Sequence, residues 1–275
     1  MELGLSTSAL GLHALPERLG IFAEAGVTLV EIHGYTLDEF DFGDPALVAA
    51  TRRALERYGL RLWSCHSPAY QPLDIASPDA ALRARTLTVL QEAMRASADL
   101  GAGIFLCDAV RAQPEDPGAR AVGRAHYAES LRVLLGAAGP LGLRLVVENH
   151  TRIEGFFVTP EDFLRLIADH DLAGLGACWD TGHGWIKGQP PAAACRLGPH
   201  LVTLHIHDND GRRDQHLLPT RGGATWEPFV PCLRRIGYAG PFMMELVPPD
   251  PKTVEDVERL VRDALEVYRR FVRPE

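Results

Sequence analysis

The sequence predicts one (β/α)8 barrel, the TIM-barrel architecture, as a single domain over residues 1–275. Short apolar runs of strand type alternate eight times with amphipathic, helix-like segments, and no linker or low-complexity segment interrupts this alternation. Four of the apolar runs lead directly into acidic or imidazole side chains, as strands often do in parallel α/β proteins. An open doubly wound sheet is the alternative. No Gly-rich GxGxxG follows the first strand, so we favour the closed barrel.

The first four units have clear start and stop signals. The expected strands cover residues 3–6, 28–32, 60–65 and 103–107. The helices that follow the first three strands begin near Pro16, at Asp44-Pro45 and at Ser77-Pro78-Asp79, and they end at Gly26, Gly59 and Leu100. Asp and Ser side chains cap free N–H groups at helix starts, and proline fits the first helical turn.

The last four units follow the same order, with strands expected at residues 143–147, 175–179, 201–204 and 241–246. A helix over residues 120–138 precedes the first of these strands. Thr159-Pro160-Glu161-Asp162 predicts another helix start, because acidic residues favour the positive end of the helix dipole. Shorter helices are expected at 192–197 and 226–236, and the last helix at 253–270.

Composition and charge argue against several classes of protein. With 46% apolar and 23% charged residues, the chain resembles an ordinary globular protein that can bury a large core. The net charge is −8 and no Lys/Arg cluster exceeds a dipeptide, which argues against nucleic acid as a partner. The sequence contains no signal peptide and no run of about 18 apolar residues, so we expect a cytoplasmic protein without a membrane span.

The five cysteines are odd in number, far apart in the sequence and without a CxxC pair. Cys65, Cys107 and Cys178 lie in or just after strand-like runs. We interpret these three as small buried apolar residues rather than as catalytic or disulfide-bonded ones.

Four strand ends carry side chains suited to a divalent cation: Glu148, Asp180, His205 and Glu245. They follow four consecutive strands of the predicted barrel, whose ends meet at one rim, so we expect them to converge. Three carboxylates and one imidazole favour Mn²⁺, Mg²⁺ or Co²⁺ over a structural Zn²⁺. The alternative is that each acid caps a helix or pairs with an arginine, which needs no metal.

The same segments resemble the signature of a known family. They are Val147-Glu148-Asn149, Trp179-Asp180-Thr181-Gly182-His183, His205-Ile206-His207-Asp208-Asn209, Asp214-Gln215-His216 and Met244-Glu245. Together they resemble the xylose isomerase-like barrel superfamily of sugar-phosphate isomerases and epimerases, which shares its barrel with the metal-dependent apurinic (AP) endonucleases. The resemblance spans nearly the whole chain.

This resemblance implies one divalent metal per chain, bound by Glu148, Asp180, His205 and Glu245. It also implies that Glu148 and Glu245 form the general acid/base pair that exchanges protons with substrate carbons. The expected reaction is isomerisation or epimerisation of a small sugar, sugar phosphate or hydroxy-keto acid through a metal-stabilised enediolate.

Substrate-binding residues are expected near the same rim. By the resemblance, His66 and His183 occupy positions that touch substrate or an extra metal. Arg212 lies just past the seventh strand, where its guanidinium could bind a phosphate or carboxylate in bidentate fashion. Glu31 and His33, after the second strand, are further candidates for lining the pocket.

The segment His205-Ile206-His207-Asp208 offers two histidines, of which one is the expected ligand. His205 has the family's HxxD spacing to Asp208. We therefore expect His207 to face the other way on the strand, or to lie beyond it, and not to bind the metal.

Two other functions stay open. An AP endonuclease-like phosphodiesterase acting at abasic DNA sites is disfavoured by the acidic charge and by Cys107, which ends the fourth strand without the histidine of those nucleases. Asp214 and His216 nevertheless resemble a pair that binds another metal in that branch. A non-catalytic sugar- or metal-binding barrel is the third reading. The resemblance also implies a carbohydrate-like small-molecule partner and a homo-oligomer.

Overall fold

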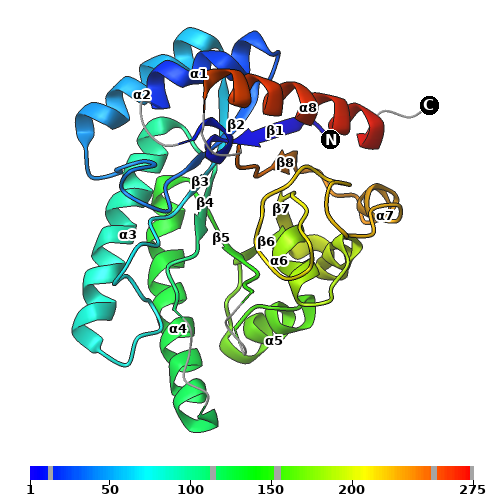
Figure 1. Ribbon diagram of the computed structural model, residues 1–275. Helices are drawn as coiled ribbons and strands as arrows, with labels where there is room; N and C mark the ends of the chain where they lie inside the picture. The colour runs from blue at the N-terminus through cyan, green and yellow to red at the C-terminus, as the bar shows by residue number, and fades with distance from the viewer. Residues whose placement is uncertain (12–14, 112–115, 152–155, 249–252, 273–275) are drawn as a thin grey trace.

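The computed structural model describes residues 1–11, 15–111, 116–151, 156–248 and 253–272, and it confirms the (β/α)8 barrel (Figure 1). The eight parallel strands within these residues are β1 (Leu3–Ser6), β2 (Leu29–His33), β3 (Arg61–His66), β4 (Ile104–Cys107), β5 (Arg144–Glu148), β6 (Gly176–Asp180), β7 (Leu201–His205) and β8 (Phe242–Met244). Successive strands from β1 to β7 pair in order, and β8 pairs with β1. A single bridge between Ile206 and Met244 closes the barrel between β7 and β8.

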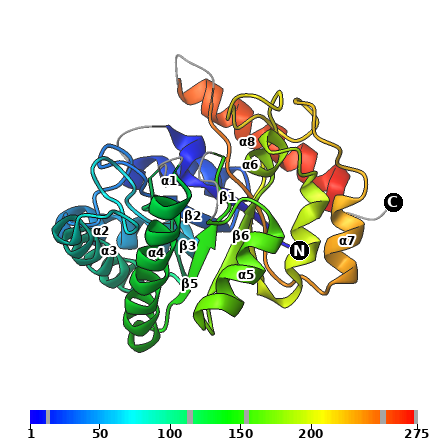
Figure 2. The same ribbon diagram turned by 90° about the horizontal axis from the view of Figure 1, so that it is seen from below.

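Helices form a ring outside the strands (Figure 2). They are α1 (Leu15–Glu24), α2 (Pro45–Tyr58), α3 (Ala80–Leu100), α4 (Pro117–Ala138), α5 (Pro160–His170), α6 (Thr181–Ile186), α7 (Phe229–Arg235) and α8 (Val254–Val272), with 3-10 segments η1 (Thr7–Leu10), η2 (Gly139–Leu141) and η3 (Pro191–His200). The last helix returns to the start of the chain, where the Tyr268 hydroxyl donates to the Met1 carbonyl at 2.8 Å.

Capping side chains set most helix starts where the sequence predicts them. Asp44 and Asp79 accept hydrogen bonds from N–H groups in the first turns of α2 and α3. Thr159 caps α5 in a reciprocal arrangement with the third residue of that helix. Helix α4 begins earlier than residue 120, because Asp116 caps it directly before Pro117.

Two further helices differ from the prediction. The segment Asp180-Thr181-Gly182-His183, where no helix was expected, begins α6, because the Asp180 side chain accepts a hydrogen bond from the His183 backbone N–H at 2.6 Å. Helix α7 starts at Phe229 instead of residue 226. The Trp226 indole donates to the Asp208 carboxylate at 2.9 Å and so holds the preceding segment against the loop after β7.

The buried apolar side chains form two clusters. The larger one lies between strands and helices and contains the fully buried Phe22, Phe105 and Trp179. The smaller one fills the barrel interior and comprises Ile104, Leu106, Val146, Cys178 and Val202. Buried polar side chains, among them Glu31 and Ser64, accompany this apolar cluster beneath the carboxyl ends of the strands.

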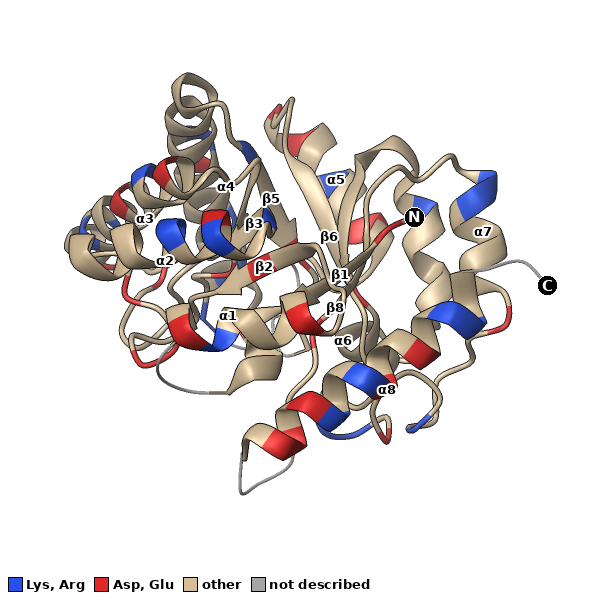
Figure 3. Cartoon of the chain, turned by 90° about the horizontal axis from the view of Figure 1, so that it is seen from above, with Lys and Arg blue, Asp and Glu red and all other residues tan. Residues whose placement is uncertain are grey.

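Charged side chains are spread over the outer helices. Figure 3 shows acidic and basic residues interspersed along α8 and α2, without a continuous basic face in that view. This distribution agrees with the net charge of −8. Within the part of the chain that the structure describes, no helix is long and apolar enough to cross a membrane.

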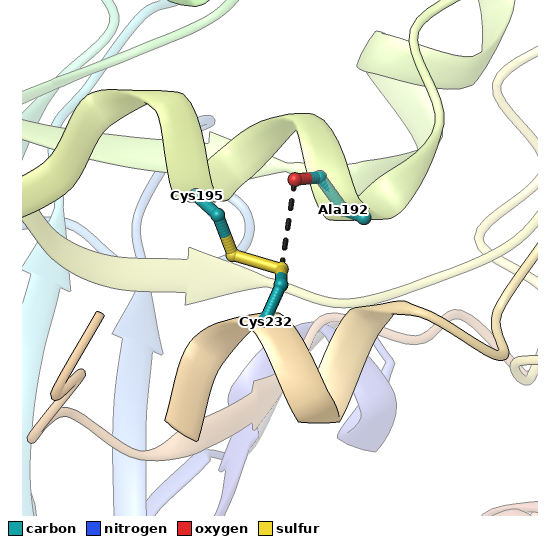
Figure 4. The surroundings of a disulfide bond; sticks show 3 residues. All are labelled: Ala192, Cys195 and Cys232. Atoms are coloured by element: carbon teal, nitrogen blue, oxygen red, sulfur yellow. Dashed lines mark hydrogen bonds between the residues drawn. A yellow bond between two sulfur atoms is a disulfide. The ribbon is translucent and has the colours of Figure 1, made fainter. Parts of the chain in front are cut away.

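A disulfide that the cysteine spacing did not predict links two outer segments. Cys195 in η3 and Cys232 in α7 are bonded, with Cα atoms 6.1 Å apart and a sequence separation of 37 (Figure 4). The partners meet because η3 precedes β7, α7 precedes β8, and both pack on the same side of the barrel. Cys65, Cys107 and Cys178 are free and buried, as predicted.

We expect the double substitution Cys195→Ser and Cys232→Ser to lower the free energy of unfolding by about 3 kcal/mol relative to the oxidised wild type. The crosslink restricts the unfolded chain over a loop of this length. Denaturant unfolding measures the difference, and the wild type under reducing conditions is the control that should match the double variant. Equal stability of the oxidised wild type and the double variant would contradict the prediction.

Candidate active site and metal centre

A cavity of about 590 Å³ opens at the carboxyl ends of the strands. Residues that follow every strand of the barrel contribute to its wall, and most are polar. They include Thr7, His33, His66, Asp108, Glu148, His150, His183, Asp214, His216 and Glu245. Carboxyl ends of parallel strands meet at one rim, which explains why residues so distant in sequence share one cavity.

The four predicted metal ligands converge in this region. Glu148 ends β5, Asp180 ends β6, His205 ends β7 and Glu245 follows β8. One potential ligand atom from each lies within 4.8 Å of those from the other three, and all four residues are buried. Their strand-end placement in the sequence therefore did predict their proximity.

Two side chains hold the strand ends in place. The Asn149 amide donates to the Asp180 carbonyl at 3.0 Å and accepts from the Asp180 backbone N–H at 2.7 Å, which ties β5 to β6. The Asp208 carboxylate accepts hydrogen bonds from the N–H groups of Thr220 and Ala224, which fixes the loop after β7. These two residues of the sequence motifs shape the rim and are not among the four converging ligands.

Each of the two glutamates faces three imidazoles. Glu148 lies 3.1 Å from His205, 3.4 Å from His183 and 3.5 Å from His66. Glu245 lies 3.1 Å from His33, 3.4 Å from His205 and 3.6 Å from His216. His205 is common to both sets, so the two carboxylates flank it in similar surroundings.

These contacts control ionisation in the buried site. Burial raises the pKa of Glu148 and of Glu245, but the nearby histidines, His205 foremost, outweigh burial and hold both pKa values well below the ordinary range. Burial lowers the pKa of His205, yet the surrounding acidic groups raise it well above its ordinary value. The carboxylates are therefore ionised and available as ligands or as bases.

The donor set fits a divalent cation. Three buried carboxylates and one imidazole concentrate negative charge where a hard cation would be bound. Cys178 also lies within reach of Glu148 and His205, but burial raises the pKa of its thiol well above the ordinary range. A protonated thiol is a poor ligand, so the oxygen-rich set is the better fit.

Of the two placements expected for His207, the one beyond the strand holds, because β7 ends at His205, and the one facing away from this region is wrong. Residues two apart on an extended segment share a face, so His207 points inward like His205. Its Nε2 lies 2.9 Å from the Asp180 carboxylate, and its ring stacks on His216 with centroids 4.0 Å apart. His207 forms possible ligand groups with Asp180 and His183, and with Asp214 and His216.

Of the three residues predicted to bind substrate, two line the cavity and one does not. His66 and His183 line the cavity, and the His183 Nε2 atom lies 2.9 Å from the Asp214 carboxylate. Arg212 is exposed on the loop after β7, where its backbone N–H donates to Asp210, and it is not among the described residues of the cavity wall. His33 lines the cavity as expected, whereas Glu31 lies below it, fully buried.

Two histidine–carboxylate pairs in the cavity wall were not predicted. His33 lies 3.1 Å from Glu39, and His150 lies 2.9 Å from Asp108. Glu39 and Asp108 belong to the loops after β2 and β4, in which the sequence analysis singled out no residue. In the sequence, only their position after a strand could have pointed to these two acids, because acidic residues in such loops lie near the rim.

Most of the chain matches a known protein family. Residues 19–271 match the family model described as xylose isomerase-like TIM barrel. The chain belongs to this xylose isomerase-like TIM barrel family. The match covers all eight helices named above except the start of α1 and the last residue of α8, and it covers every strand except β1.

Relatives within the family include sugar epimerases. The chain is 30% identical over 120 residues to an uncharacterized protein of Methanocaldococcus jannaschii, covering 42% of this chain and 41% of that protein. It thus spans less than half the length of that relative. It is 28% identical over 200 residues to fructoselysine 3-epimerase of Escherichia coli O157:H7, covering 72% and 71%. A crystal structure of D-psicose 3-epimerase with D-fructose superposes with a TM-score of 0.80 at 20% identity, covering 99% of both chains.

We expect Glu39→Gln to destabilise the metal-free protein by about 2–3 kcal/mol at pH 7. Burial raises the pKa of Glu39, but His33 and Thr36 outweigh burial and lower it to about 2, against 4.5 unperturbed. Because the folded-state pKa is the lower one, this stabilisation is present above pH 4.5 and disappears as the pH falls towards 2.

Denaturant unfolding at pH 7 and at pH 3 measures this effect. The difference between wild type and Glu39→Gln should narrow at the lower pH. The exposed Glu227→Gln is the matched control and should have no effect at either pH. A difference that stays constant between the two pH values would contradict the assignment.

Proposed function

We propose that the protein is a divalent-metal-dependent isomerase or epimerase of a small sugar, sugar phosphate or hydroxy-keto acid. The observation that carries this proposal is the pair of buried glutamates, Glu148 and Glu245, which flank His205 at a large polar cavity. The sugar epimerases among the relatives support the same class of enzyme.

The metal would be held by Glu148, Asp180, His205 and Glu245. Bound there, a divalent cation would polarise the substrate carbonyl and make the adjacent C–H more acidic. The oxygen-rich set favours Mn²⁺, Mg²⁺ or Co²⁺ over Zn²⁺, with one ion per chain.

The chain's own groups then move the proton. One glutamate removes the proton from the carbon next to the carbonyl, which leaves an enediolate. The other glutamate delivers a proton to the opposite face of that carbon, and the configuration is inverted. His66 and His183 line the same cavity and would donate hydrogen bonds to substrate oxygens. The exposed Arg212 stays a predicted substrate contact that only a movement of its loop would bring to the cavity.

The experiment that tests the function is a screen in D₂O. The purified protein, loaded with Mn²⁺, Mg²⁺ or Co²⁺, is incubated with ketohexoses, ketose phosphates and hydroxy-keto acids, and proton NMR follows deuterium uptake next to the carbonyl. Turnover with exchange at that carbon supports the proposal. Absence of both across the panel and the three metals would contradict it.

We expect Glu148→Gln and Glu245→Gln each to lower kcat by about 1,000-fold or more, since a neutral amide cannot take a proton. The fold should persist, as circular dichroism will show. Glu227→Gln, on the exposed surface, is the matched control and should keep full activity. Full activity in both site variants would refute the proton-transfer roles and leave a non-catalytic binding barrel as the better reading.

We expect His205→Ala to weaken Mn²⁺ binding severely and His207→Ala to weaken it mildly. His205 belongs to the four-residue group, whereas His207 contacts the Asp180 edge of that group. Isothermal titration of the metal-free variants with Mn²⁺ provides the comparison. The reverse order would reassign the ligand to His207.

An AP endonuclease-like phosphodiesterase is the second candidate. It is favoured by the grouping of His207, Asp214 and His216 next to Asp180, which could hold a further ion. Elemental analysis separates the two functions. About one Mn, Mg or Co per chain supports the isomerase, and two or three Zn per chain with cleavage of abasic DNA supports the nuclease.

A further inference from the structure

Glu31 is a fully buried acid in the middle of β2, below the cavity and outside its wall. A carboxylate without water is costly unless charged or hydrogen-bonded groups compensate it. The proposed reaction gives Glu31 no part as ligand or base. Its burial therefore needs a separate explanation.

The contacts of Glu31 are specific. The Ser64 hydroxyl donates to its Oε2 at 2.6 Å, and the Nε2 atom of His205 lies 3.0 Å from Oε1 and 3.1 Å from Oε2. His205 and Ser64 are both fully buried. Strands β2, β3 and β7 thus contribute one residue each to a connected chain beneath the rim.

The two ring nitrogens of His205 face in opposite directions. Nε2 faces Glu31 below, while Nδ1 lies 3.1 Å from Glu148 and 3.4 Å from Glu245. When the ring is neutral, as a metal ligand must be, an imidazole that donates Nε2–H to a fixed carboxylate has its lone pair on Nδ1. The lone pair then points at the group of potential ligands.

We propose that Glu31, held by Ser64, is the positioning residue that fixes His205 with Nδ1 as its metal-binding atom. This inference rests on the metal-dependent function proposed above. A carboxylate behind a ligating histidine sets the ring orientation and makes the ring a stronger donor, and its loss typically weakens metal binding 10- to 100-fold. Glu31 acts only through His205 and touches neither substrate nor metal.

Three variants separate this role from a general structural one. Glu31→Ala removes the contact, Glu31→Gln keeps its shape and an acceptor but loses the charge, and Ser64→Ala removes only the support of Glu31. Asp162→Asn is the control, because it removes a capping carboxylate at α5 on the outside of the barrel.

The measurement is the Mn²⁺ dissociation constant, obtained for metal-stripped protein by electron paramagnetic resonance of free Mn²⁺. We expect an increase of about 10- to 100-fold for Glu31→Ala, a smaller one for Glu31→Gln and the smallest for Ser64→Ala. Asp162→Asn should bind like the wild type even if its melting temperature falls. Wild-type affinity in the Glu31 variants would overturn the proposal.

A second measurement remains decisive if Glu31→Ala does not fold. Nitrogen-15 NMR of the wild type, labelled at histidine and loaded with Mg²⁺, should show His205 protonated at Nε2 and metal-bound at Nδ1. The opposite pattern would overturn the proposal. If the Glu31 variants bind Mn²⁺ more weakly but no sugar is turned over, the epimerase function is refuted and the positioning role stands. If the wild type turns over a sugar but the Glu31 variants bind Mn²⁺ as tightly as the wild type, only the positioning role is refuted.

Discussion

The burial of several carboxylates at one end of the barrel is the constraint on which the site depends. Glu31, Glu148, Asp180 and Glu245 are each at most 3% exposed. Such groups stay ionised without water only if positive or donating groups surround them. The chain supplies five imidazoles from four of the eight strand ends, namely His33, His66, His183, His205 and His216. A cation placed among the same acids would offset their repulsion further. The buried acids therefore need positive charge nearby, and a bound metal ion would supply part of it.

The residues of the family motifs are of two kinds: those that carry charge at the cavity and those that hold the strand ends in place. Glu148, Asp180 and His205 place charge at the cavity. Asn149 and Asp208, which belong to the same motifs, use their side chains to hold β5 to β6 and to fix the loop after β7. A close group of ligands needs rigid supports, because small shifts of a strand end would separate the carboxylates.

The sequence was sufficient for the fold and for the four converging side chains, since strand periodicity, helix caps and strand-end placement are local signals. It was insufficient where a partner comes from elsewhere in the chain. The Cys195–Cys232 bond depends on how η3 packs against α7. The pairing of Glu31 with His205 joins residues 174 positions apart. His207 lies beyond the end of β7, as one of our two alternatives had it, and its inward direction could have been predicted because alternation along an extended segment places it with His205.

The near-equivalence of Glu148 and Glu245 bears on the direction of the proposed reaction. Each carboxylate faces three imidazoles, and the two share His205. In an epimerisation the forward and reverse directions exchange the roles of base and acid between the two groups. Although burial raises the pKa of both carboxylates, the nearby histidines hold it well below the ordinary range, so neither group is marked out as the acid or as the base. The one clear difference is Glu39, which backs the histidine beside Glu245 and has no counterpart behind His66, where the ring contacts the Ser67 carbonyl instead. The charge on Glu39 therefore distinguishes the surroundings of Glu245 from those of Glu148.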